Sequence, residues 1–172
     1  MKLQKCRAHG AICQPNQFAE TGHRYPTQPG VVRPVRFYHI EVENHHCSKT
    51  AFNCYGYLEH IKDVKKGKAL DIKLVEYKWR GVVFPNVIIP YGASRELDAF
   101  HVYHDAPSQL RLGSFTDSPE HVHILSRPGD YELFFGVHSE NFGHTSSAFL
   151  LHFGGKSVDD ITFTPKPLPT SV

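Results

Sequence analysis

The chain has 172 residues, a formal net charge of +2 and 21% charged residues. This length fits one domain with a substantial core, and the small net charge argues against a nucleic-acid-binding surface. No apolar run approaches the ~20 residues of a membrane helix, so we expect no membrane span in this chain. The first residues lack the apolar run of a signal peptide. The compartment is left open between the cytosol and, for a piece of a longer protein, the cell envelope.

Residues 1–34 contain four prolines and show no sustained hydrophobic period, which predicts an extended N-terminal arm. Two alternating segments follow within residues 36–61. Their apolar positions are Tyr38, Ile40 and Val42, then Cys54, Gly56 and Leu58. Alternation with a period of two is typical of half-buried strands. Because only a short polar stretch joins the two segments, we expect them to pair as one antiparallel hairpin.

Further strand-like segments follow the hairpin and are separated by turn signals such as Pro128-Gly129. They lie at 70–79, 82–84, 87–89, 95–103, 110–112, 131–137 and 149–153. No window shows a helical period of apolar residues. We therefore predict an all-β fold, an antiparallel Ig-like β-sandwich of about 7–9 strands. The sandwich is expected to span residues 35–155, followed by a Pro-rich C-terminal tail at 156–172.

The first strands also resemble a known family. Val42-x-Asn44, followed by Thr50-Ala51-x-Asn53-Cys54-x-Gly56-x-Leu58, is similar to the hairpin of CARDB-like Ig-fold domains. Such domains occur in prokaryotic surface and membrane-associated proteins, and an uncharacterised subgroup shares the later Pro128-Gly129-x-Tyr131-x-Leu133 pattern. These residues serve turns and packing. The resemblance, over residues 36–153, therefore implies a fold and a non-catalytic interaction or spacer module, with no catalytic residues.

Thirteen histidines are an unusual number for this length. The candidate metal ligands among them are His101, His104, His121, His123 and His138. Residues two apart on a strand share a face, so His121 and His123 are placed to bind one zinc or copper ion together. The alternative is that both face water while Val122 points into the core.

The four cysteines are Cys6, Cys13, Cys47 and Cys54. Each successive pair, Cys6 with Cys13 and Cys47 with Cys54, is spaced more widely than the two to four intervening residues usual in structural zinc sites. Free thiols, disulfides and a zinc site all remain open. We expect Cys54 to point into the core, where a thiol behaves as a small apolar side chain.

The sequence contains no Gly-x-Ser-x-Gly elbow, no His-Glu-x-x-His motif and no Walker loop. We therefore predict no enzyme and no cofactor, but an interaction or structural module with a protein partner or a larger assembly, homo-oligomers included. The first alternative is a histidine-based metal-binding protein or metalloenzyme. The second is a carbohydrate-binding module that uses Tyr55, Tyr57, Tyr91 and Trp79.

Overall fold

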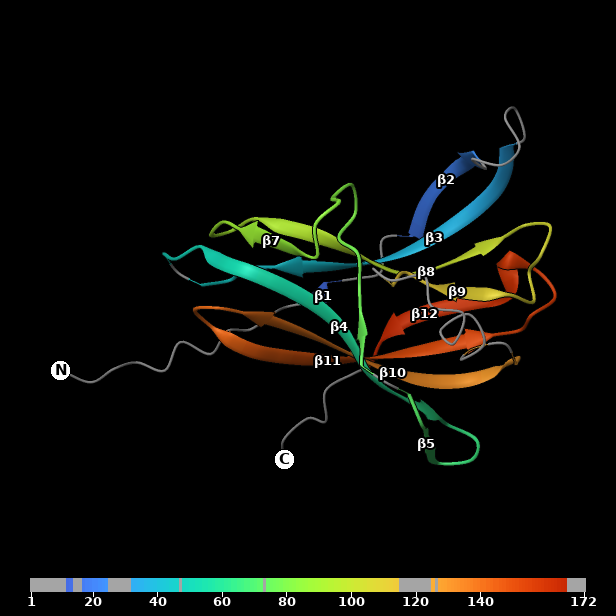
Figure 1. Cartoon of the computed structure of the whole chain (residues 1–172). Helices are drawn as coiled ribbons and strands as arrows, with labels where there is room; N and C mark the ends of the chain where they lie inside the picture. The colour runs from blue at the N-terminus through green and yellow to red at the C-terminus, as the bar shows by residue number, and fades with distance from the viewer. Residues whose placement is uncertain are drawn as a thin grey trace.

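The computed structural model describes residues 12–13, 17–24, 32–46, 48–72, 74–114, 125 and 127–166. They form twelve strands and one short 3-10 helix, in two antiparallel sheets that face each other (Figure 1). The predicted all-β sandwich is confirmed. Its strands outnumber the 7–9 predicted because several have only two to four residues. The described residues include no helix long and apolar enough to cross a membrane.

The smaller sheet is built around one long strand, β3. Its strands are β1 (Ile12–Cys13), β2 (Gln17–Arg24), β3 (Val32–Glu43), β8 (Ser94–Tyr103) and β9 (Leu110–Leu112). On one side β3 pairs with β1 and β2, and on the other with β8, which in turn pairs with β9. The described parts of the predicted arm are thus paired strands, and the domain boundary predicted at residue 34 lies inside β3.

The larger sheet has β4 and β10 at its centre. Its strands are β4 (Ala51–Asp63), β5 (Lys68–Leu70), β6 (Val75–Glu76), β7 (Asn86–Ile89), β10 (Gly129–Ser139), β11 (Gly143–Phe153) and β12 (Ile161–Pro165). β11 and β12 extend the sheet beyond β10, whereas β5, β6 and β7 share the far side of β4. Because β12 pairs with β11, the sandwich continues past residue 155, where the tail was predicted to begin. Residues 167–172 lie outside the described residues.

The predicted hairpin of residues 36–61 is wrong. β3 belongs to the smaller sheet and β4 to the larger one, so the two strands face each other across the core instead of pairing. The Asn44 side chain stabilises the connection between them. Its Nδ2 donates to the carbonyls of Lys49 at 2.8 Å and Ile89 at 3.0 Å, and its Oδ1 accepts from the amide of His46. These bonds turn the chain from one sheet into the other.

The core between the sheets is rich in aromatic rings. Tyr38 stacks on Phe100 with 4.4 Å between ring centroids, and Phe100 meets Phe163 edge-on at 5.0 Å. Phe163 also stacks on Phe149, which lies on the same sheet. All four side chains are fully buried. Large rings in edge-on and stacked contacts contribute both apolar burial and specific geometry, so this chain of rings ties the two sheets together.

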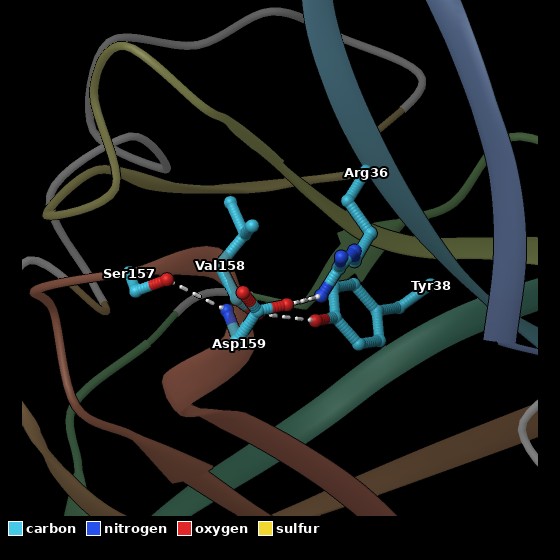
Figure 2. A network of polar contacts seen from close by, with 5 residues as sticks. All are labelled: Arg36, Tyr38, Ser157, Val158 and Asp159. Atoms are coloured by element: carbon cyan, nitrogen blue, oxygen red, sulfur yellow. Dashed lines mark hydrogen bonds and ion pairs between the residues drawn. The ribbon is translucent and has the colours of Figure 1, made fainter.

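A cluster of polar contacts, called the polar clasp below, also connects the two sheets (Figure 2). Arg36 and Tyr38 of β3 reach the 3-10 helix η1 (Val158–Asp160), which leads into β12. Arg36 Nη1 donates to the Val158 carbonyl at 3.0 Å and pairs with Asp159 Oδ1 at 2.9 Å. The Tyr38 hydroxyl donates to the same carbonyl at 3.3 Å, and Ser157 caps the helix by accepting from the Asp159 amide. Burial raises the pKa of Tyr38, so this hydroxyl stays a donor.

Candidate functional site

One of the longer segments without charge lies around β7. Residues 81–94 contain no Asp, Glu, Lys or Arg, although Arg80 and Arg95 flank them. Several large apolar side chains in this segment are exposed to solvent: Val83 (80%), Phe84 (66%), Ile88 (52%) and Tyr91 (58%). Together with Phe52 they are called the β7 surface below. Contiguous exposed apolar groups mark interaction sites more often than scattered single ones do.

β7 itself presents apolar side chains to both faces of the sheet. Val87 and Ile89 are buried, whereas Ile88 between them points to solvent. β7 pairs with β4 so that Phe52, which is also exposed, lies near Ile88. Within the described part of the chain, β4 is the one strand that pairs with β7. Edge strands usually bear charges that prevent pairing with other chains, and this one bears none.

A small cavity lies behind the β7 surface, at the end of the sandwich where the two sheets separate. Its volume is about 50 Å³, and its lining includes Ala51, Cys54, Ile89, Val137 and Phe142. Small-molecule sites usually measure about 300–1,000 Å³. This cavity therefore suits the tip of one apolar side chain from a partner better than it suits a substrate.

Cys54 lies at this cavity and confirms the predicted core position. Its thiol is free and the residue is 1% exposed. Burial raises the pKa of the thiol to about 11, although a hydrogen bond with the Ile89 backbone partly opposes the shift. A neutral, buried thiol is a poor nucleophile and a poor metal ligand. Cys6 and Cys47 lie outside the described residues, and only the backbone of Cys13 is described, so their pairing or zinc binding stays a prediction.

The structure describes three of the five predicted metal ligands, and they lie on different elements. His101 is on the outer face of the smaller sheet, where its ring contacts Phe37 at 5.3 Å, and His104 is in the turn after β8. His138 is exposed on the outer face of the larger sheet, on the opposite side of the sandwich. His121 and His123 lie outside the described residues. Within the described ranges, no three His, Cys, Asp or Glu side chains come together as a metal site.

Among the aromatic residues predicted to contact carbohydrate, Trp79 is not available to a ligand. It is 1% exposed, and its indole Nε1 donates to the Pro85 carbonyl at 3.2 Å, so it is a core residue. Tyr55 and Tyr57 do lie on the outer face of the larger sheet, with parallel rings 6.3 Å apart. Tyr91 is exposed but belongs to the β7 surface.

The β7 surface was not predicted as a site. The apolar runs at 82–84 and 87–89 are typical of core strands, and nothing in a period-two pattern tells which members stay exposed. The available signal was the absence of charge between Arg80 and Arg95. Strands in a core lack charged residues as often as interface segments do, so this signal does not distinguish the two.

Comparison with known proteins adds little. No protein-family model and no curated protein matches the chain. Among solved structures, the chain is similar to one titled "X-ray structure of Northeast Structural Genomics Consortium target SoR45". That similarity has 13% sequence identity and a TM-score of 0.33, and it covers 88% of this chain and 84% of the other. The resemblance to CARDB-like domains stays a prediction.

Proposed function

We propose that this protein is a non-catalytic interaction module, an Ig-like β-sandwich that binds another protein chain through the β7 surface. The observation that supports this function is the uncharged edge strand with exposed Val83, Phe84 and Ile88 around it. Polar groups border it: Asn53 Nδ2 donates to Glu140, and Asn86 Nδ2 donates to Asn53. An apolar centre with a polar rim is the usual anatomy of a protein interface.

The proposed partner is a second copy of this chain. In a two-fold symmetric contact a residue on the axis lies near its own symmetry mate, so a charge there would face a like charge. Residues 81–94 offer no such charge. Antiparallel pairing of β7 with β7 would continue the larger sheet from one copy into the next, with main-chain hydrogen bonds supplying part of the affinity. The exposed rings of Phe84 and Tyr91 supply further apolar area.

Light scattering after size-exclusion chromatography tests this function. We expect the wild-type chain to form a dimer at micromolar to millimolar concentrations, and Ile88→Asp and Phe84→Asp to be monomers. Leu74→Asp is the matched control, because Leu74 is 61% exposed yet lies outside the β7 surface; it should remain a dimer. Circular dichroism checks that each variant is folded.

Salt dependence gives a second readout. Ion pairs at an interface weaken as salt rises, whereas burial of uncharged apolar surface does not. The dimer should therefore persist unchanged between low and high salt. A wild-type chain that stays monomeric over the whole concentration range, or dimers that survive both Asp substitutions, would contradict self-association through β7.

A further inference from the structure

The outer face of the larger sheet contains a β-bulge that redirects two side chains. His60 of β4 pairs with Phe134 of β10, and Leu58 pairs with Phe135, so Glu59 is an extra residue on β4. As a result, Glu59 and His60 both lie on the outer face, while Leu58 and Ile61 remain buried. Bulges of this kind often re-aim side chains at functional sites.

The redirected Glu59 carboxylate joins two side chains of β11. Its Oε1 lies 2.8 Å from His144 Nε2, and its Oε2 accepts from the Ser146 hydroxyl at 2.8 Å. The pair crosses directly over Gly136 of β10. A Cβ at position 136 would lie 2.2 Å from Glu59 Oε1 and 2.6 Å from His144 Cε1. The glycine therefore makes room for this cluster, which stays partly open to solvent.

Aromatic rings lie on both sides of the cluster along β4. The ring of His60 stacks on Phe134 with 3.7 Å between centroids and an interplanar angle of 18°. In the other direction, Tyr55 and Tyr57 are parallel within 17°. From Tyr55 to His60 the strand extends roughly 17 Å at about 3.3 Å per residue. The face thus alternates ring surfaces with hydrogen-bonding groups over a length that suits an extended ligand.

Three carboxylates on this face have partners, and a fourth, that of Glu76 on β6, lies opposite Tyr57. Glu59 has His144, Glu132 has Lys166, and Asp130 lies 2.6 Å from His152. Most carboxylates on the described part of the face are therefore already hydrogen-bonded. A neutral ligand with many hydroxyl groups fits this electrostatic pattern better than a phosphate or an acidic peptide does.

We propose that the outer face of the larger sheet is a binding site for a neutral oligosaccharide. Sugar rings have an apolar C–H face that packs on the aromatic rings, and their hydroxyls donate to the remaining lone pairs of the Glu59 carboxylate and to the Ser146 hydroxyl oxygen. Hydrogen bonds to a charged carboxylate are the stronger ones, so Glu59 is assigned the main specificity contact. The site is independent of the proposed self-association, because it uses different side chains.

The test is a titration of the isotope-labelled chain with single neutral hexasaccharides (cellohexaose, xylohexaose, mannohexaose and maltohexaose) followed by NMR. At least one should shift the amides of Tyr57, Glu59, Phe134 and Ser146. Glu59→Gln keeps the size of the side chain but removes its charge, and we expect it to weaken binding by at least about tenfold. Gln109→Ala changes an exposed side chain between β8 and β9, on the smaller sheet, and should bind like the wild type.

Two further variants guard against a folding defect in Glu59→Gln. Ser146→Ala and Phe134→Ala should each weaken binding while leaving the dispersion of the spectrum unchanged. The proposal is overturned if none of the four sugars shifts any amide at about 10 mM, a concentration that detects even millimolar affinities. It is equally overturned if binding maps to other residues and survives all three substitutions.

Discussion

Gly56 of β4 and Leu97 of β8 meet so closely across the core that a Cβ at position 56 would lie 2.4 Å from Leu97 Cδ1. Leu97 is fully buried, and side chains in a close-packed core have little room to shift. We therefore expect Gly56→Ala to destabilise the protein by about 1–3 kcal/mol through overpacking. Urea unfolding measures this, and adding Leu97→Ala should reverse part of the steric cost. A wild-type midpoint for Gly56→Ala would contradict the close approach.

Within the polar clasp, the hydrogen bonds to the Val158 carbonyl should contribute more to stability than the ion pair with Asp159 does. Arg36→Met removes a bond to the Val158 carbonyl, and Tyr38→Phe removes another; each is expected to cost about 0.5–1.5 kcal/mol. Asp159 is 78% exposed, so Asp159→Asn should change the free energy of unfolding by less than about 1 kcal/mol. Denaturant titrations of the three variants test the order. If Asp159→Asn were the most damaging, the ion pair and not the carbonyl would hold the clasp.

The raised pKa of the Cys54 thiol should make the folded state less stable at alkaline pH. Folding raises the pKa of its thiol from 9.0 to about 11, so the folded state holds the proton more tightly than the unfolded state. The resulting stabilisation is complete below pH 9 and is lost as the pH rises toward 11. The unfolding free energy of the wild type should therefore fall more steeply over this window than that of Cys54→Ala. Identical slopes would show that the thiol is solvated in the folded protein.

The lowered pKa of Asp63 should make the folded state less stable at acid pH. The backbone amide of Lys66 donates to its carboxylate at 2.9 Å, which lowers the pKa of Asp63 below 3.8; the Lys66 ammonium adds to this. Stability from this turn is thus present above that pH and is lost as the pH falls through the folded pKa. Because the backbone bond dominates, Lys66→Ala should keep most of the shift. An NMR titration that finds an ordinary pKa in this variant would exclude that cause.

The strand pattern of the sequence was correct, but the partners of the strands were not predictable from it. Tyr38, Ile40 and Val42 point inward whether β3 pairs with β4 or faces it, since both arrangements have the same period of two. The deciding information is the bonding of Asn44, which depends on Ile89, far away in the chain. Local patterns therefore predicted the inner faces and the fold class but not the crossing between sheets.

For the candidate sites as well, local patterns predicted burial but not contacts between distant strands. The predicted burial of Cys54 is confirmed, because it follows from the phase of its own strand. The Glu59–His144 cluster was missed, because it depends on a bulge that the sequence does not reveal and on a contact between β4 and β11. The predicted exposure of Trp79 was wrong for a similar reason, since its burial depends on the packing of distant strands.

The clasp between Arg36 and Val158 joins residues 122 positions apart, and this distance has a consequence for synthesis. During translation β3 and β4 leave the ribosome long before β10, β11 and β12, which complete the sandwich. Long-range pairings form late and slowly, and unpaired apolar strands are prone to aggregate in the meantime. The nascent chain therefore holds β4 and its aromatic neighbours without their partners until β10, β11 and β12 emerge. Aggregation during that interval is therefore expected to lower the yield of folded protein.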